Sequence, residues 1–417
     1  MRVNQYLKLT LNLIGVLLLS SSVLASSKAK ILTIAFYADG DSHHGALRKL
    51  AREFEQENPS IHIRLTSYRT IENYSKQVDY WLYTDNGPEL IFWYGGQRLK
   101  HYAEQGKLHQ IDDMWAKHQL TNNFSLPSRE ASQINGHYYA IPITSYLWGL
   151  VYDEKALKTL DIQVPQTWQQ LLQSCQKLRQ QEVDMFSLGS QTTWVMHAWF
   201  DYLNLRVNGL NYHQKLLQGQ IAYDDVGVID TLKHWKQLLD YGCFNDNHSA
   251  FTRRQAFPRI LHNMSLMSLA DGPTHQIPEQ KRQGLRIASF PQIHKNIPQY
   301  TVAPVNVFIL PSHTEKSAEL DKLVEFISSI QFQSEFNNII NRPAAHIHAT
   351  AEDNIIIKQM QDTLRSSPGG IQYLDRDTDI RFGERSPYIF ENFMRHQDVK
   401  RCAKELEQLR QHVFGPL

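Results

Sequence analysis

Strand-like and helix-like segments alternate along the first part of the chain, and this alternation restricts the fold more than any other feature. Residues 31–37 are mostly apolar and β-branched, as in a buried strand, and residues 61–68 alternate as a second strand. Between them, apolar residues recur at helical spacing from Ser42, the expected N-cap, to Asn58. Another helix is predicted over residues 71–82. Right-handed crossovers between such strands give a parallel sheet with helices on both faces, so the predicted fold class is α/β.

A third strand, within residues 89–96, ends in two large aromatic residues. Its apolar run, residues 90–92, has the composition of a buried parallel strand, and Trp93 and Tyr94 follow at its carboxyl end. Two glycines then allow a sharp turn and leave room beside the backbone. In an open parallel sheet, ligands bind outside the carboxyl ends of the strands. The segment therefore predicts a ligand crevice, although a core strand with two aromatic residues under a loop explains the same pattern.

The first strand is predicted to end beside the third. Tyr37 closes the first strand, and Asp39 and Asp41 follow it within four residues. We expect the two acidic residues to share one rim with the aromatic pair of the third strand. Carboxylates this close in sequence make a poor acid and base pair for catalysis. Accepting hydrogen bonds from sugar hydroxyls, or capping a helix, suits them better.

The composition excludes some partners and favours others. The chain has 417 residues, enough for two domains, and its 43 basic side chains nearly cancel its 42 acidic ones. No basic field is therefore present to hold nucleic acid or an anionic membrane. The chain also contains 8 Trp, 19 Tyr and 18 Phe. Trp and Tyr suit a site that stacks on flat apolar faces and also forms hydrogen bonds.

The first 25 residues have the pattern of a signal peptide. Arg2 and Lys8 give a positive start, residues 9–19 are mostly apolar, and small residues stand near Ala25, where a signal peptidase cleaves. The apolar run is short and interrupted, so we do not expect it to span a membrane. No cysteine follows the cleavage point, which argues against a lipid anchor there. We expect an exported periplasmic protein without direct membrane insertion, and a monomer.

A long extended passage over residues 135–152 indicates a crossover between two α/β regions. Tyr146 and Trp148 lie in this passage, so we expect them in the hinge or in the cleft between the two regions. Residues 301–310 are a candidate for the return crossover.

The second region supplies two more candidate site residues. Thr167 and Gln170 fit a capping box at the start of a helix. Trp194 begins an aromatic-rich helix that is predicted to pack inward, and we name it as a candidate ligand contact. Asp271 follows a predicted strand over residues 264–269, again placing a polar group at a strand end.

Three cysteines remain, Cys175, Cys243 and Cys402, and they are widely spaced. Their number and spacing exclude a disulfide-dense scaffold and any CxxC motif for zinc or redox chemistry. Cys175 and Cys402 fall on apolar helix faces, so we expect buried thiols. One bridge, from Cys175 to Cys243, is the alternative.

Common catalytic and metal motifs are absent from the sequence. It contains no GxxxxGK[ST], GxSxG or HExxH motif. The histidine pairs at 43–44 and 346–348 have no carboxylate or cysteine at ligand spacing. We therefore expect no metal, no cofactor and no enzymatic activity. A pair of carboxylates for glycoside hydrolysis stays open, because such a pair is formed in space and not in sequence.

An ordered set of motifs covers nearly the whole chain after residue 25. With these residues the chain resembles the extracellular solute-binding proteins of bacterial ABC sugar importers, the maltose-binding-like family. The motifs are residues 37–41, 54–59, 87–91, 136–142, 148–152, 165–168 and 205–219. Two departures stand out. Glu89 occupies a position where the family more often has Asp, and Asp271 begins an Asp-Gly-Pro where many members have Gly-x-Trp.

The resemblance implies a two-lobed fold in which crossover strands join the lobes and a sugar binds between them. It divides the chain into residues 26–142 plus 288–332 for the first lobe, and 143–287 plus 333–417 for the second. Implied partners are a small sugar ligand and the membrane permease of an ABC transporter. The implied substrate-binding residues are Tyr37, Asp39, Asp41, Trp93, Tyr94, Tyr146, Trp148, Trp194 and Asp271.

Two other functions compete with sugar delivery. The first is a sensor that presents its closed form to a receptor kinase or chemoreceptor. The second is a secreted carbohydrate-active enzyme, which would need two carboxylates facing each other across the cleft. Residues 381–387 are interpreted as a charged loop that braces the second lobe and does not touch ligand.

Overall fold

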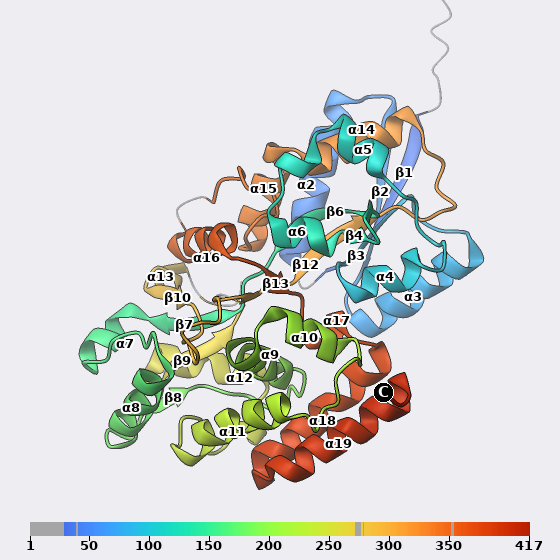
Figure 1. Cartoon of the computed structure of the whole chain (residues 1–417). Coiled ribbons are helices and arrows are strands. Elements are labelled where there is room, and N and C mark those ends of the chain that lie inside the picture. Colours follow the sequence, from blue (N-terminus) through green and yellow to red (C-terminus); the bar gives the residue numbers. More distant parts are fainter. Residues whose placement is uncertain (1–28, 39–40, 272–276, 278, 352–353) are drawn as a thin grey trace, which may run out of the picture.

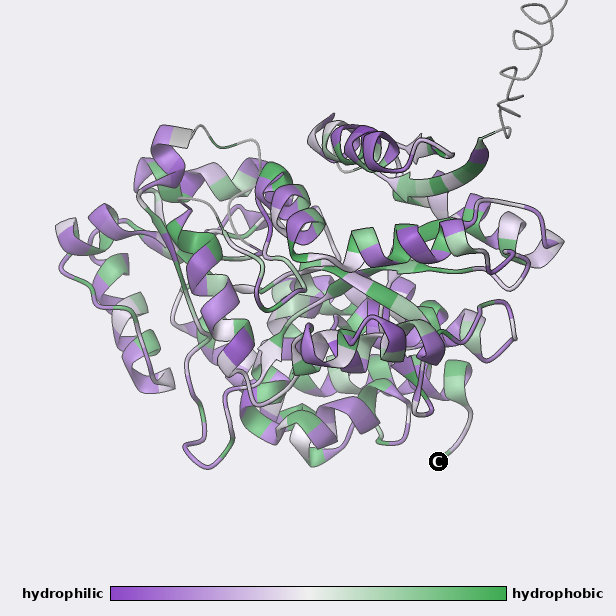
Figure 2. Cartoon of the chain, turned by 90° about the horizontal axis from the view of Figure 1, so that it is seen from above, coloured by the Kyte–Doolittle hydropathy of each residue, from purple (hydrophilic) through white to green (hydrophobic). Residues whose placement is uncertain are grey.

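The computed structural model describes residues 29–38, 41–271, 277, 279–351 and 354–417. Two α/β lobes lie side by side, the first at the upper right of Figure 1 and the second at the lower left. In the view from above, hydrophobic residues mark the strands, while hydrophilic residues mark the outer turns of the helices (Figure 2). No helix among the described residues is long and apolar enough to cross a membrane.

The first lobe is built on a mixed five-stranded sheet of order β2-β1-β3-β12-β6. Both β2 and β3 run parallel to β1, as the strand and helix alternation predicts, while β12 is antiparallel to β3 and to β6. Strand β12 belongs to a later part of the sequence, after the strands of the second lobe. The strands are β1 (Lys30–Tyr37), β2 (Ile61–Tyr68), β3 (Leu90–Tyr94), β6 (Ala140–Ser145) and β12 (Val305–Ile309), and a hairpin of β4 (Gln133–Ile134) and β5 (His137–Tyr138) lies beside them.

Amphipathic helices cover this sheet. In the first of them, Leu47, Leu50 and Phe54 recur at helical spacing and are buried against the sheet. This helix begins at Asp41, so Ser42, the expected N-cap, lies inside its first turn. The helices of this lobe are α2 (Asp41–Glu57), α3 (Ile71–Thr84), α4 (Gln97–Ala103), α5 (Asp112–Lys117), η1 (Leu120–Asn122), α6 (Leu126–Ala131), α14 (Ala318–Ser328) and α15 (Ile330–Ile340).

The second lobe has a four-stranded sheet of order β10-β7-β9-β8. The central strand β9 is antiparallel to β7 and parallel to β8, and all six of its residues are buried. Asp271 follows β9 directly, at the strand end where the sequence predicted a polar group. The strands are β7 (Gly149–Asp153), β8 (Asp184–Phe186), β9 (Ser265–Ala270) and β10 (Leu285–Ala288).

Helices surround the second sheet, and α9 lies in their centre with nearly every residue buried. Thr167 and Gln170 form the capping box that the sequence predicts at the start of α8. The helices are α7 (Glu154–Thr159), α8 (Trp168–Arg179), α9 (Val195–Asn208), α10 (Leu210–Leu217), α11 (Val226–Asp240), η2 (His248–Ala250), α12 (Arg253–Ala256), η3 (Phe257–His262), α13 (Glu279–Arg282), α17 (Leu374–Asp377), α18 (Ile380–His396) and α19 (Val399–Phe414).

The chain crosses between the two sheets where the sequence predicted it. Strand β6 of the first sheet leads through Tyr146 to β7 of the second, and the return runs from β10 through β11 (Thr301–Val302) to β12. A further connection leaves α15, passes through α16 (Ile355–Ser366), and pairs β13 (Gly370–Ile371) with β11. These passages bring residues that are far apart in sequence to the junction of the lobes (Figure 1).

The preferred prediction for the cysteines is wrong for two of the three. Cys175 of α8 and Cys243, just after α11, form a disulfide with their Cα atoms 5.0 Å apart, while Cys402 is a buried free thiol. Helical spacing predicted that Cys175 faces inward. It could not identify the partner, because that partner lies on another element 68 residues away. A disulfide fits a protein that is exported to an oxidising compartment.

The charged loop predicted over residues 381–387 is instead part of helix α18. The helix contains Gly383 and Pro387, although proline cannot donate a hydrogen bond to the carbonyl four residues earlier. The helix continues because both residues are buried against the second core, which compensates for the lost bond. Arg381 pairs with Asp379 and also donates to the Val413 carbonyl, so this segment braces the second lobe as expected.

The predicted limits of the two lobes stay a prediction, and α15 is the element that bears on them. Its side chains Phe332, Phe336 and Ile340 pack in the same core as β1 and β3. Residues 333–340 therefore lie against the first sheet, although the predicted limits assign them to the second lobe.

Candidate ligand-binding site

Several aromatic side chains meet where β3 ends and the crossover begins. Tyr94 is the last residue of β3, and Tyr146 follows β6 in the next strand but one of the same sheet. Burial raises the pKa of the Tyr94 hydroxyl, and the neighbouring hydroxyls of Tyr146 and Tyr37 raise it further. Burial outweighs the charges of Arg376 and Arg98, which act to lower the pKa, so the Tyr94 hydroxyl is a protonated donor at neutral pH. Strand pairing places all three tyrosines at the same end of the first sheet.

A series of direct side-chain contacts connects these tyrosines with the second lobe. The Asn306 amide of β12 donates to the Tyr146 hydroxyl at 2.6 Å, and its oxygen accepts from Arg376 at 3.4 Å. The Arg376 guanidinium also lies over the Tyr94 ring, 4.1 Å from its centre. The Arg342 guanidinium lies over Tyr146 at 4.7 Å.

The same series of contacts continues through Asp271 and returns to Arg376. Arg253 donates to one carboxylate oxygen of Asp271 at 3.0 Å, and Arg342 forms an ion pair with the other at 2.8 Å and donates to the Asp271 main-chain carbonyl. Arg253 lies over the ring of Trp194, which contacts Tyr373 edge to face at 5.9 Å. Tyr373 in turn lies 5.9 Å from the Arg376 guanidinium, which closes the path. We call this closed path the arginine–aromatic circuit, and its members are Arg376, Asn306, Tyr146, Arg342, Asp271, Arg253, Trp194 and Tyr373.

Asp271 is the one carboxylate in the circuit. Burial alone would raise its pKa, but the charges of Arg342 and Arg253 outweigh burial and hold the pKa of Asp271 below its usual range. Asp271 is therefore ionised at neutral pH, with a guanidinium on each of its oxygens.

The two tryptophans predicted for the second lobe differ in exposure. Trp148 is 2% exposed and packs edge to face against Trp194 and Tyr373. Trp194 stands just before α9 and is 38% exposed, so part of its side chain is accessible to solvent. Trp194 is thus a platform on which a ring can stack, and Trp148 supports that platform from below.

Six of the nine residues predicted for the site are not members of the circuit: Tyr94 and Trp148 contact its members, Tyr37 lies on β1 of the first sheet, and Trp93, Asp41 and Asp39 remain. Trp93 is 3% exposed, packs against Tyr74 and Tyr102, and donates its indole hydrogen to the Arg98 carbonyl. The Asp41 side chain is exposed and faces Arg69 at 3.4 Å. Asp39 lies outside the described residues.

Five contributors were missed by the sequence analysis, namely Asn306, Arg253, Arg342, Arg376 and Tyr373. Arg253 and Arg376 belong to short helices of four residues each, and Arg342 follows the end of α15. Such positions carry no periodic pattern and match no motif. Of the five, only Asn306 had a sequence signal that could have indicated a site residue. It lies near the start of a strand in the predicted return crossover, and that strand pairs with β3 at Tyr94.

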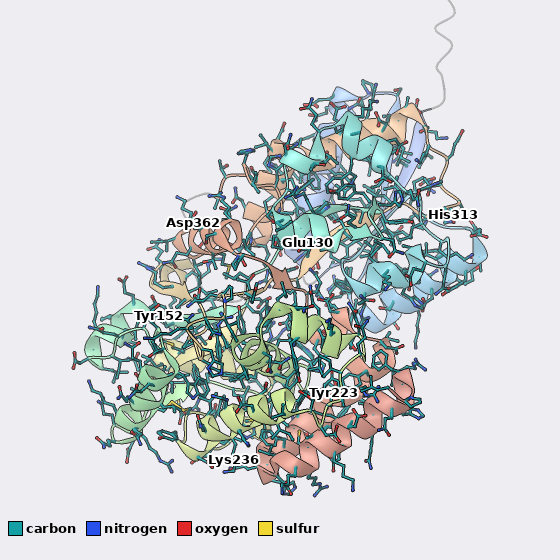
Figure 3. All side chains as sticks on the ribbon, in the orientation of Figure 1. Glu130, Tyr152, Tyr223, Lys236, His313 and Asp362 are labelled. Atoms are coloured by element: carbon teal, nitrogen blue, oxygen red, sulfur yellow. A yellow bond between two sulfur atoms is a disulfide. The ribbon has the colours of Figure 1, made fainter. Side chains whose placement is uncertain are left out.

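A cavity of about 930 Å³ lies elsewhere, between α6 and α16. Asp362 of α16 and Arg129 of α6 line it, and Figure 3 labels Asp362 and the neighbour of Arg129, Glu130. Its lining is polar and aliphatic, and its one aromatic residue, Phe124, is 2% exposed. A sugar site needs an open aromatic face, so we place the candidate site at the circuit. Among the described residues, no group of three or more His, Cys, Asp and Glu side chains is arranged to hold a metal ion.

Comparisons with known proteins agree with the fold. The chain is 23% identical over 329 residues to an uncharacterised ABC transporter extracellular-binding protein of Pyrococcus horikoshii, covering 77% of this chain and 73% of that one. It is 20% identical to the multiple sugar-binding protein of Streptococcus mutans, covering 80% and 82%. Among solved structures it is similar to the bacterial solute receptor AcbH, with a TM-score of 0.83 and 20% identity, covering 92% of this chain and 99% of that one.

Residues 40–331, more than half of the chain, match the model of one protein family. Together with the two lobes, the crossover strands and the circuit at their junction, this match identifies the chain as a member of the bacterial extracellular solute-binding protein family.

Proposed function

We propose that this protein captures a sugar between its two lobes and delivers it to the membrane permease of an ABC transporter. The relative in Streptococcus mutans is named a multiple sugar-binding protein, and the structurally similar receptor AcbH has an exclusive substrate preference for β-D-galactopyranose. The family is one of extracellular binding proteins, and we propose the periplasm as the compartment.

The observation that carries this proposal is the arginine–aromatic circuit. It combines an open aromatic face at Trp194 with hydrogen-bonding groups at Asn306 and Tyr146. An aromatic face covers the C–H face of a pyranose, while the polar groups pair with its hydroxyls. A hydrogen bond contributes about 0.5–1.5 kcal/mol, but a buried partner left unpaired costs about 1–3 kcal/mol, which is how such a site rejects the wrong epimer.

We further propose that ligand binding closes the lobes. Asn306 belongs to the first sheet, whereas Asp271 follows a strand of the second. A ligand that touches both sides binds the closed state better than the open one and so shifts the population toward it. The closed form is then the state that a transporter distinguishes from the empty protein.

For the site itself, we propose the members of the circuit together with Tyr37, Tyr94 and Trp148. The sequence also predicts Trp93, Asp39 and Asp41 as binding residues, and we do not include them in this set. We also propose that the first lobe continues beyond residue 332 to the end of α15, because Phe336 and Ile340 pack in the first core.

The proposal is tested by a thermal-shift screen of the chain from residue 26 against monosaccharides, disaccharides and oligosaccharides. A ligand at 100 times its dissociation constant adds about 2.7 kcal/mol of stability, which is a shift of several degrees. Recovery of the unchanged sugar would separate binding from catalysis. A sugar consumed during incubation would favour a carbohydrate-active enzyme, and no shift with any sugar would contradict the proposal.

A matched pair of variants then locates the site. Trp194→Ala should weaken sugar binding about 30-fold, since truncation of an aromatic anchor removes about 2 kcal/mol or more. Tyr388→Ala is the control, because Tyr388 is a 63% exposed aromatic residue on α18. Equal affinities of the two variants, measured by isothermal titration calorimetry, would exclude Trp194 from the site.

A further inference from the structure

The arginine–aromatic circuit has more positive than negative charge. It contains three guanidiniums, from Arg253, Arg342 and Arg376, but only one carboxylate, that of Asp271. Both oxygens of that carboxylate are already occupied, one by Arg253 and the other by Arg342. The circuit therefore lacks a carboxylate for its third guanidinium.

Arg376 is this third guanidinium. It lies between the rings of Tyr94 and Tyr373, and its hydrogen bond to the Asn306 oxygen is 3.4 Å long. Within the described part of the chain, no carboxylate lies within ion-pair distance of Arg376. Its donors are thus positioned by stacking, with most of their hydrogen-bonding capacity unused.

The acidic residues on either side of Arg376 are turned to other partners. The Asp375 carboxylate lies 3.7 Å from Arg98 of α4. The Asp377 carboxyl accepts backbone hydrogen bonds from Gln372 and Gln97. Burial raises the pKa of Asp377 to about 7, so it carries only part of a negative charge at neutral pH. Neither residue forms an ion pair with Arg376, although the charge of Arg376 acts to lower the pKa of Asp377.

A buried hydroxyl without a partner lies in the same circuit. Tyr373 is 5% exposed, and its hydroxyl forms no hydrogen bond with any described residue. Burial raises the pKa of this hydroxyl, and the charge of Asp271 raises it further, while Arg253 and Arg376 act in the opposite direction. The hydroxyl is therefore a neutral donor among charged groups. Leaving such a donor unpaired carries a desolvation cost, which a ligand oxygen would recover.

These contacts favour one class of ligand. A guanidinium offers two parallel N–H donors that match the two oxygens of a carboxylate, and it holds them in a fixed plane. Arg376 supplies one such fork, which has a long hydrogen bond to Asn306 and no carboxylate partner among the described residues, and Tyr373 lies between it and Trp194. We propose that the ligand is an acidic saccharide whose ring carboxylate, as in a uronic acid, binds Arg376 and accepts the Tyr373 hydroxyl hydrogen. This inference rests on the proposed function and narrows it.

The test compares matched sugars that differ only at C6, galacturonate with galactose and glucuronate with glucose, together with short oligosaccharides of each kind. Isothermal titration calorimetry at neutral pH should give at least about 30-fold tighter binding for the acidic member of one pair, the range expected for a charge-assisted bidentate pair. Binding of a neutral sugar as tight as its acidic counterpart would contradict the acidic ligand and leave sugar capture intact. A folded protein that binds neither series would contradict both proposals.

Variants of Arg376 test whether its guanidinium binds the carboxylate of the ligand. Arg376→Gln should weaken binding of the acidic sugar about 30-fold, while Arg395→Gln, at an exposed ion pair with Glu391 on α18, should leave it unchanged. Arg376→Lys retains the charge without the fork and should fall between them. Full affinity in a folded Arg376→Gln protein would overturn the assignment.

Tyr373→Phe tests the hydroxyl separately. It removes one oxygen that has no described partner and that costs free energy to bury, so the melting temperature of the empty protein should stay the same or rise. Affinity for the acidic sugar should fall about 5- to 10-fold, the loss expected for one hydrogen bond. A purely structural tyrosine would give the opposite result, with lower stability and unchanged affinity.

Discussion

Two aromatic clusters of this molecule have similar residues and different surroundings. In the first, Trp93 packs with Tyr74 and Tyr102 inside the first core, and its indole hydrogen is bound to a backbone carbonyl. In the second, Trp194 contacts Trp148 and Tyr373 at the junction of the lobes, beside Arg253.

The difference between the clusters lies in exposure and in charge. Trp93 is 3% exposed and Trp194 is 38% exposed, and among the tryptophans of the two clusters only those of the second have an arginine over their rings. Aromatic content therefore does not mark a ligand site by itself. An aromatic face becomes a platform where tertiary structure leaves it open and brings polar groups beside it.

The largest expected effect separates the two tryptophans by stability. Trp93→Ala should lower the free energy of unfolding by about 3–5 kcal/mol, the usual loss for a large buried aromatic residue, because it leaves a cavity in the first core. Urea unfolding followed by circular dichroism measures this loss. A change below about 1 kcal/mol would show that Trp93 is not a core residue, and the comparison of the clusters would fail.

The next effect comes from the charges of the second cluster. Asp271→Asn removes the carboxylate that Arg253 and Arg342 share, and should lower stability by about 3 kcal/mol, as when one partner of a buried ion pair is removed. Because the pKa of Asp271 is lowered in the folded state, its contribution is present above the usual carboxyl pKa and disappears as the pH falls through the folded value.

Comparing the unfolding of Asp271→Asn with that of the unchanged protein from about pH 2 to neutral pH checks this prediction. The difference between them should be greatest near neutral pH and shrink toward the acid end. A difference that stays constant over the whole range would mean that the charge of Asp271 does not stabilise the fold.

A third effect concerns a contact between the two lobes. Asp377 of α17 accepts a backbone hydrogen bond from Gln97, at the start of α4 and shortly after Tyr94. Burial raises its pKa from 3.8 to about 7, so the folded state binds more protons than the unfolded state between these values. The contribution of Asp377 is therefore full below about pH 4 and is lost as the pH rises through about 7.

Asp377→Asn should remove this pH dependence, which for a single proton has a slope of at most about 1.4 kcal/mol per pH unit. Thermal unfolding at intervals from about pH 4 to about pH 8 measures it, with Asp375→Asn as the matched control on the same helix. Identical pH profiles for Asp377→Asn and the unchanged protein would show that Asp377 is not a buried acid.

The sequence predicted the parts of this structure that depend on local pattern. The alternation of strands and helices, the crossover near Tyr146 and the capping box at Thr167 depend on residues within a few positions of each other, and all three are confirmed. The disulfide of Cys175 and the pairing of Arg342 with Asp271 join residues 68 and 71 positions apart. No periodicity or turn signal encodes such a distance.

The candidate site likewise has residues that local sequence pattern predicts and residues that it does not. Tyr94, Tyr146 and Asp271 were named because they stand at or just after strand ends, and strand ends can be located in a sequence. The arginines come from short helices and a helix terminus, where their direction depends on how the lobes pack. Tyr146, Trp194 and Asp271 of the circuit were therefore named from the sequence, whereas its three arginines, Asn306 and Tyr373 were not.

The smallest stability effect is expected at Trp194. Trp194→Ala removes two edge-to-face ring contacts but leaves little cavity, since the ring already faces solvent, so the loss should be about 1 kcal/mol. Trp93→Ala is the matched control, because the chemical change is the same. If both variants lost equal stability in urea, exposure would not distinguish the clusters. If Trp194→Ala instead kept its stability and lost sugar affinity, the second cluster would be the one that serves the ligand.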